Sequence, residues 1–216
     1  GDTMLIQAYQ QLLKVPSDNL ESIMSLFNKT AIQVCEGQFQ DMYFEKNKEV
    51  GLDDYLQMIE YKTAVLLACS LKIGAILGGA SKEDGEKLYD FGIKIGIAFQ
   101  LQDDFLDVFG KEENFGKQIG RDILANKRTF LYLKACSIAT DEQREKLQSY
   151  YNDTNLTDSD KVEKVKLMFK ALSIEKHTQE LIEEYYKEAF QYLDQINTDN
   201  KEQLLFFIKK LIKRVQ

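Results

Sequence analysis

The sequence has few residues that interrupt helices. Its 216 residues include a single proline, Pro16, and 12 glycines. Because proline lacks a backbone hydrogen-bond donor and clashes with the preceding helical turn, its scarcity allows long uninterrupted helices almost everywhere. Histidine is equally scarce. His177 stands alone, which excludes a di-iron bundle built on Glu-x-x-His motifs and argues against a histidine-based catalytic triad.

Cysteine is also scarce, and no long apolar run is free of charge. Cys35, Cys69 and Cys136 are scattered without a Cys-x-x-Cys pair. Each lies in an apolar helical pattern, so we expect buried free thiols in a reducing compartment. Charged residues interrupt the apolar runs that approach the length of a membrane span: Lys72, Asp90 and Lys94. With no signal-peptide pattern at the start, these features predict a cytoplasmic protein without a membrane span.

Acidic residues outnumber basic ones, and the formal net charge is −7. This charge disfavours general nucleic-acid binding, because phosphate backbones attract basic surfaces. An acidic protein that handles anionic substrates needs local basic residues or a metal. Apolar residues make up 44% of the chain, which is enough for a real core, and the length suits one sizeable domain.

Apolar residues recur at helical spacing along the chain, and no period-two strand pattern persists. We therefore predict a single all-α domain over residues 1–216. A short helix should precede the turn at Pro16, a long helix should follow it, and helical pattern runs from Asp53 to the acidic stretch near residue 107. Gly92 and Gly96, four residues apart, would let a neighbouring helix approach closely. Four amphipathic helices are expected at 141–151, 158–173, 175–193 and 200–215.

An acidic stripe ends the apolar run that begins at Phe91. On a helix with about 100° per residue, the polar side chains of the stripe fall within an arc of about 100°: Gln100, Asp103, Asp104 and Asp107. Like charges at this spacing repel, and their neighbours are apolar, so a cation would stabilise the stripe. Oxygen ligands suit Mg²⁺, which takes one or two carboxylates and shares its sphere with waters and phosphates. A solvated acidic end of an ordinary helix is the alternative.

Three lysines flank this stripe in the sequence. Lys62 lies among apolar residues on one helix face, where its charge needs an anion. A bound phosphate would satisfy it, and snorkelling to the surface is the alternative. Lys117 lies in the glycine-punctuated stretch 110–120, and Lys127 follows it. These two suit a diphosphate, although a solvated basic loop would look the same. Asp53-Asp54 indicates ordinary helix capping.

The order of these motifs resembles the trans-isoprenyl diphosphate synthases, also called polyprenyl synthetases. The stretch Phe99 to Asp107 is similar to the family's second aspartate-rich motif, and Lys62-Thr63 is similar to its lysine–threonine pair. Further matches are Gly1-Asp2, Glu36-Gly37-Gln38 with Asp41, Gly116-Lys117 with Gly120-x-Asp122, and Lys127-x-Thr129. The resemblance holds in order from the first residue to about residue 135, and the helical tail is compatible with it. It implies the isoprenoid synthase fold.

The resemblance also implies a reaction and the residues that perform it. Members condense an allylic diphosphate with isopentenyl diphosphate in a 1'-4 trans elongation. Diphosphate leaves the allylic substrate with the help of Mg²⁺, the isopentenyl double bond attacks the cation, and a proton is lost. The implied metal ligands are Asp103, Asp104 and Asp107. The implied diphosphate-binding residues are Lys62, Lys117 and Lys127. The implied catalytic residues are Lys62, Thr63 and Gln100.

One family element has no counterpart in the sequence. The first aspartate-rich motif would stand upstream of Gly1, and Asp53-Asp54 does not replace it because Gln57 stands where a third acid is needed. We therefore expect this chain alone to be inactive, or nearly so, with Mg²⁺ and both substrates, although the parent protein would be an enzyme. The resemblance further implies a homodimer, with the first two helices forming much of the interface.

Two other functions compete with this interpretation. A non-catalytic helical subunit of a heteromeric prenyl synthase would bind and modulate a catalytic partner, but it would not need a metal-and-diphosphate constellation. A terpene cyclase with the same fold usually carries an Asn/Asp-Ser/Thr-Glu second motif, whereas Asp103-Asp104-x-x-Asp107 stands here. The retained lysines and aspartates therefore favour the prenyltransferase.

Overall fold

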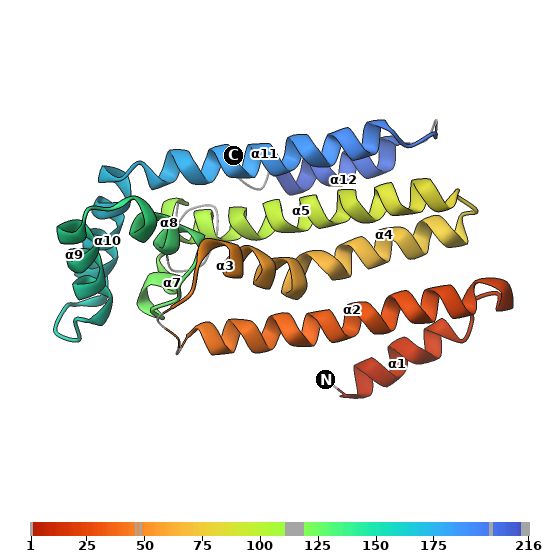
Figure 1. The fold of residues 1–216 in the computed structure, drawn as a ribbon, viewed down its shortest axis with the longest axis horizontal. Helices are drawn as coiled ribbons and strands as arrows, with labels where there is room; N and C mark the ends of the chain where they lie inside the picture. The colour runs from red at the N-terminus through yellow and green to blue at the C-terminus, as the bar shows by residue number, and fades with distance from the viewer. Residues whose placement is uncertain (1, 46, 48, 111–118, 199–200, 213–216) are drawn as a thin grey trace.

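The computed structural model describes residues 2–45, 47, 49–110, 119–198 and 201–212, and within them it is helical without a strand. This confirms the predicted all-α class. The long helices run side by side, and several short ones gather at one end of the bundle (Figure 1). The elements are α1 (Asp2–Leu12), α2 (Ser17–Phe44), α3 (Leu52–Ile59), η1 (Glu60–Ala64), α4 (Val65–Leu77), α5 (Lys82–Phe109), α7 (Arg121–Leu124), α8 (Phe130–Ile138), α9 (Asp141–Asn152), α10 (Asp158–Ala171), α11 (Ile174–Asp194) and α12 (Glu202–Ile212).

Helix α5 is the central element of the bundle. It packs against α4 on one side and α11 on the other, and its Phe91, Ile95 and Leu101 are fully buried. The predicted close approach at the two glycines is confirmed. A Cβ added at Gly96 would lie 2.4 Å from the Cα of Ala64, and one added at Gly92 would meet Ala68 in the same way. Small residues on both helices thus bring the backbones of η1 and α4 onto α5.

The helical segment that begins after Gly51 contains one wide turn. Helix α3 passes into the π-helical turn η1 and then into α4, so the three elements form one continuous rod. The start of α3 has the predicted capping chemistry, since the Asp54 carboxylate accepts a hydrogen bond of 2.8 Å from the Gly51 N–H. The π turn was not predicted. Such turns insert a residue into the helical ladder and often occur at functional sites, and this one carries Lys62 and Thr63.

Most of the other predicted helices lie where expected, including the last four. Ser81 caps α5, with its hydroxyl accepting from the Asp84 N–H at 3.0 Å. The short helix α7, which opens after Gly120, was not predicted. Within the described residues, none of the helices combines the length and the apolar character needed to cross a membrane.

The prediction for the cysteines is wrong at one position. Cys69 is buried and Cys136 is half-buried, but Cys35 is exposed. The physical reason is that α2 is apolar on more than one side, and Cys35 lies on a side where Ile32, Phe39 and Met42 are exposed as well. An apolar helical pattern identifies faces that can be buried, but it does not say which of them is buried within this chain.

Candidate active site

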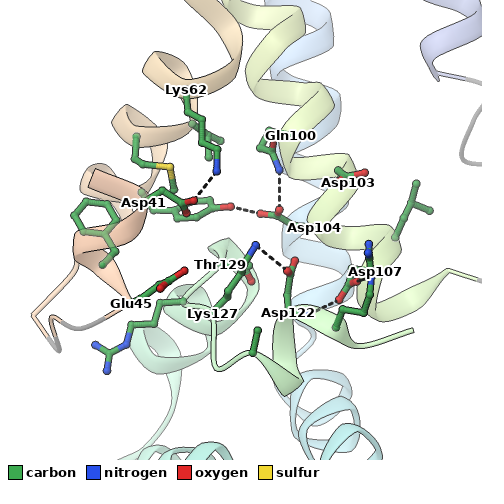
Figure 2. A pocket seen from close by; sticks show the side chains of 18 of the residues that line it. Asp41, Glu45, Lys62, Gln100, Asp103, Asp104, Asp107, Asp122, Lys127 and Thr129 are labelled. Atoms are coloured by element: carbon green, nitrogen blue, oxygen red, sulfur yellow. Dashed lines mark hydrogen bonds and ion pairs between the residues drawn. The ribbon is translucent and has the colours of Figure 1, made fainter. Parts of the chain in front are cut away.

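A cavity of about 300 Å³ lies where α2, α3, η1 and α5 meet the segment 119–129. Charged side chains from all these elements surround it (Figure 2). Its acidic residues are Asp41, Glu45, Asp103, Asp104, Asp107 and Asp122. Its basic residues are Lys62, Arg121, Lys127 and Arg128. Among the described residues of the lining, carboxyl groups therefore outnumber cationic groups, which favours the addition of a cation, or of a cation together with an anion.

The three aspartates of the α5 stripe have different environments. Asp103 is exposed at the cavity, and none of the described residues forms an ion pair or hydrogen bond with its carboxylate. Asp104 is buried, with 4% of its surface exposed. Consecutive helical residues point about 100° apart, so these two neighbours cannot face the same surroundings. Asp103 is thus the stripe's carboxylate most available to a ligand.

Asp104 lies in a buried hydrogen-bond network that joins three elements (Figure 2). The Tyr55 hydroxyl of α3 donates to one carboxylate oxygen, and the Gln100 side-chain amide donates to the other at 3.1 Å. The Thr63 hydroxyl donates to the Gln100 carbonyl oxygen at 3.2 Å. Burial raises the pKa of Asp104 from 3.8 to about 8, although the Tyr55 and Gln100 hydrogen bonds oppose this rise. The network fixes the orientation of Gln100, which lines the cavity, and of Thr63, which contacts Gln100 but is not part of the lining.

Asp107 connects the end of α5 to the segment that contains α7. Its carboxylate accepts a hydrogen bond of 2.9 Å from the Asp122 backbone N–H, and the Arg121 Nε lies 3.5 Å away. Burial raises the pKa of the Asp107 carboxyl, while the Asp122 N–H opposes that rise. The Gly120 N–H also donates to the Asp107 backbone oxygen at 2.6 Å. Asp107 therefore positions α7 against α5 in this structure.

Lys62 reaches the cavity from the π turn. Its ammonium group forms an ion pair with Asp41 of α2, and 35% of its side chain is exposed. Its immediate counter-ion is therefore a carboxylate. The sequence had suggested a bound phosphate or snorkelling to the surface instead. A close approach of the backbones makes this pair possible, because a Cβ at Gly37 would lie only 2.4 Å from the Lys62 backbone nitrogen. Gly37 and Asp41 are one helical turn apart on α2.

A second lysine–aspartate pair lies across the cavity (Figure 2). The Lys127 ammonium is 3.3 Å from the Asp122 carboxylate. Burial by itself lowers the pKa of Lys127, but the charge and hydrogen bond of Asp122 raise it above its ordinary value. Arg128 donates to the Asn47 carbonyl at 2.8 Å. Lys117, the remaining predicted diphosphate ligand, lies outside the described residues.

Of the predicted site residues within the described ranges, all except Thr63 line this cavity. Sequence reasoning quoted Asp41 and Asp122 as members of motifs but gave them no role, and it missed Tyr55. The first two could have been found from their spacing, because each follows a glycine by one helical turn or less. Tyr55 gives no such signal. Its contact with Asp104 joins residues 49 positions apart and depends on how α3 packs on α5.

The oxygen atoms that line the cavity fit part of a Mg²⁺ coordination sphere. All the candidate ligands are oxygen atoms, which Mg²⁺ prefers. Among the described residues, however, no three acidic, cysteine or histidine side chains converge closely enough to enclose an ion. Mg²⁺ usually binds one or two carboxylates and fills its remaining positions with water and phosphate oxygens. Asp103 and its neighbours on α5 therefore fit one side of a magnesium sphere.

Asp104 makes the stability depend on pH. Between pH 3.8 and about 8, the folded state retains a proton that the unfolded state releases. The stability that this proton contributes is complete below that window and is lost as the pH rises through it. We predict that, in buffer without divalent metal, the melting temperature of the wild type falls by several degrees relative to Asp104→Asn between pH 5 and pH 8. Parallel curves for the two proteins would contradict the assigned environment of Asp104.

Solved structures share this fold. A crystal structure of a geranylgeranyl pyrophosphate synthase matches with a TM-score of 0.90 and 38% identity, covering 100% of this chain and 67% of that one. The geranylgeranyl pyrophosphate synthase from Corynebacterium glutamicum, solved in complex with isoprenyl diphosphate and magnesium, matches with a TM-score of 0.85 and 24% identity, covering 100% of this chain and 61% of the other. The chain therefore has the all-α isoprenoid synthase fold.

Sequence comparison identifies the family. The model of the polyprenyl synthetase family matches residues 1–171. The geranylgeranyl diphosphate synthase of Methanosarcina mazei is 44% identical over 137 residues, which are 62% of this chain and 42% of that protein. The chain belongs to the polyprenyl synthetase family. It spans only 40% to 46% of the length of three of its curated relatives.

Proposed function

We propose that this chain carries the allylic-diphosphate side of a prenyltransferase site that elongates an allylic diphosphate with isopentenyl diphosphate by 1'-4 trans condensation. One observation carries the proposal. Asp103 of α5, Lys62 of η1 and Lys127 after α7 line the same cavity, although they are far apart in the sequence. This combination suits a diphosphate held between a metal and two ammonium groups. A helical subunit without catalytic function would have no use for it.

Asp103 is the first metal ligand in this proposal, because its carboxylate is exposed at the cavity and has no partner among the described residues. Asp107 and Asp104 complete the predicted set, but each would have to exchange its present hydrogen bonds for a metal contact. Bound Mg²⁺ would act as a Lewis acid that stabilises the charge developing on the departing diphosphate. Few carboxylates are available at the cavity, so phosphate oxygens of the substrate would occupy other positions in the Mg²⁺ coordination sphere.

The lysines bind the diphosphate directly. Their present ion pairs with Asp41 and Asp122 hold Lys62 and Lys127 extended toward the cavity. Negative charge grows on the diphosphate oxygens as the allylic C–O bond breaks, so fixed ammonium groups stabilise the transition state more than the bound substrate. Lys117 is proposed as a third diphosphate ligand from its place in the family motif.

The allylic cation needs oxygen atoms beside it and no water. The Thr63 and Gln100 side chains are fixed by the Asp104 network, and we propose that their oxygens face the cation and stabilise it. Apolar side chains contribute the remaining wall, among them Phe44, Met58 and Leu106. Such a wall excludes water, which would otherwise react with the cation in place of the isopentenyl double bond. After bond formation, a proton leaves the new chain.

The assembly and compartment are also proposals. We propose one domain over residues 1–216 in a cytoplasmic homodimer. Several large apolar side chains of the first two helices are exposed, which suits a subunit interface better than a solvated surface. They include Met4, Ile6, Ile32, Phe39 and Met42.

A thermal-shift measurement tests the site without requiring turnover. In the product of the intact gene, pyrophosphate with Mg²⁺ at about 100 times the dissociation constant is expected to raise the melting temperature by about 5–10 °C. Asp103→Ala and Lys62→Ala should each reduce this shift by more than half, because each removes a direct ligand. Lys72→Ala is the matched control, since Lys72 forms a similar ion pair with Glu86 away from the cavity.

Two results would reject the site assignment. One is the absence of any shift with the wild type. The other is a shift of equal size in the wild type, Asp103→Ala and Lys62→Ala. An intact shift without prenyl transfer would instead favour the non-catalytic subunit.

A further inference from the structure

A buried lysine of α10 contacts the segment that carries Lys127. Lys161 is only 8% exposed. Its ammonium donates hydrogen bonds to the Asn126 side-chain oxygen at 2.6 Å and to the Tyr151 backbone oxygen at 2.9 Å, and it lies 5.9 Å from the centre of the Tyr151 ring. Both hydrogen-bond acceptors are neutral. Burial lowers the pKa of Lys161, the charges of Asp158 and Asp153 oppose this, and neither carboxylate lies at hydrogen-bond distance. The direct contacts of the ammonium are therefore the two neutral oxygens, one of them on Asn126.

Asn126 forms a left-handed turn directly before Lys127. Its φ is 55°, in the left-handed region that asparagine enters more readily than most other non-glycine residues. The turn around it is closed by backbone hydrogen bonds from Asn126 N–H to Ile123 O at 3.1 Å and from Lys127 N–H to Asp122 O at 2.9 Å. The turn therefore sets the direction in which the next side chain, Lys127, leaves the backbone.

The same helix holds the other end of this segment. A Cβ at Gly120 would lie 2.7 Å from both Cγ atoms of Val162, and Gly120 also has a positive φ of 79°. Helix α10 thus contacts the segment 120–126 at both ends, through adjacent residues, and it lies beside α7 at the end of the bundle (Figure 1). The Lys127–Asp122 pair is carried by this braced segment and not by one of the long helices.

We propose that Lys161 is a positioning residue for diphosphate binding, acting through Asn126 to hold Lys127 in the cavity. The inference rests on the proposed function, in which Lys127 binds the diphosphate. Lys161 itself lies outside the lining of the cavity. The proposal requires its effect to pass through Lys127, and this requirement makes the inference testable.

A double-mutant cycle in the product of the intact gene tests this route. Binding of pyrophosphate with Mg²⁺ is measured by titration calorimetry. Lys161→Met is expected to weaken binding about tenfold in the wild-type background and less than about twofold in the Lys127→Ala background. Lys164→Met is the matched control. Lys164 is an exposed lysine on the same helix that also lies over a tyrosine ring, Tyr150, and its loss should leave binding unchanged.

The outcomes distinguish failure of the positioning role of Lys161 from failure of the proposed function. Unchanged binding in Lys161→Met, or an equal loss in both backgrounds, overturns the positioning role while leaving the proposed function intact. Unchanged binding in Lys127→Ala counts against the proposed function itself. If Lys161→Met does not fold, Asn126→Gly replaces it, because glycine keeps the left-handed turn and removes only the acceptor. That variant should then weaken binding several-fold, and unchanged binding would overturn the inference.

Discussion

Asp103→Asn is expected to lower kcat for prenyl transfer about 10³-fold in the product of the intact gene. The substitution keeps the size of the side chain and removes the one charged group of the α5 stripe that is free to bind a ligand. Loss of a single preorganised electrostatic contact to the transition state typically costs this much. Steady-state kinetics with an allylic diphosphate and isopentenyl diphosphate measure the effect.

The control for this prediction is Asp90→Asn. Asp90 is an exposed aspartate on the same helix, away from the cavity, and its replacement should change kcat less than about twofold. Excess Mg²⁺ should restore part of the activity of Asp103→Asn if the lost group is a metal ligand. A kcat close to that of the wild type would show that Asp103 does not stabilise the transition state.

Gly37→Ala is expected to destabilise the protein by about 3 kcal/mol, because overpacking a tight contact forces the backbones apart. The added methyl would lie 2.4 Å from the Lys62 nitrogen and 2.8 Å from the Tyr61 carbonyl carbon. Separation of α2 from η1 would also pull Asp41 from Lys62, so the affinity for pyrophosphate should fall. Chemical denaturation measures the first effect and calorimetry the second.

Gly74→Ala provides the contrast. It makes the same chemical change in the last turn of α4, where a Cβ would have no neighbour within 4 Å. We expect it to stabilise the protein by about 0.5–1 kcal/mol, because alanine loses less conformational entropy in a helix than glycine does. Equal effects of the two substitutions would contradict the close packing of α2 on the π turn.

The fold could be predicted because its signals are local. Helical periodicity, one proline and recognisable caps determine where helices such as α5 and α11 lie. The spacing of Gly92 and Gly96 also predicted that another helix packs closely against α5. It could not predict that the contact residues are Ala64 and Ala68. The π turn left no comparable signal. A single inserted residue at Glu60–Ala64 changes which way Lys62 faces, while the apolar pattern on either side stays helical.

The site could be predicted only as a set of residues. The sequence grouped Asp103, Asp104 and Asp107 as equivalent ligands, whereas their surroundings differ. Asp104 is buried because Tyr55 of α3 packs on it, and Asp107 is capped by the Asp122 N–H. These contacts join residues 49 and 15 positions apart. They depend on tertiary packing, which periodicity along one helix does not encode.

The exposed face of α2 is a second feature that the sequence pattern could not predict. Its sequence predicted burial of Cys35, but the helix buries Ile23, Thr30 and Gly37. The face of α2 that contains its smallest residue, Gly37, therefore packs against η1. The close backbone contact at Gly37 determines this orientation of the helix. A pattern that ranks faces by hydrophobicity cannot detect a choice made by backbone contact.

The most direct test is product formation by the purified product of the intact gene. Supplied with Mg²⁺, an allylic diphosphate and isopentenyl diphosphate, it should form a diphosphate longer by one or more isopentenyl units and release one pyrophosphate per addition. Removal of Mg²⁺ with a chelator should stop the reaction. An absence of elongated product with every allylic diphosphate offered, or elongation that continues without divalent metal, would contradict the proposed prenyltransferase site.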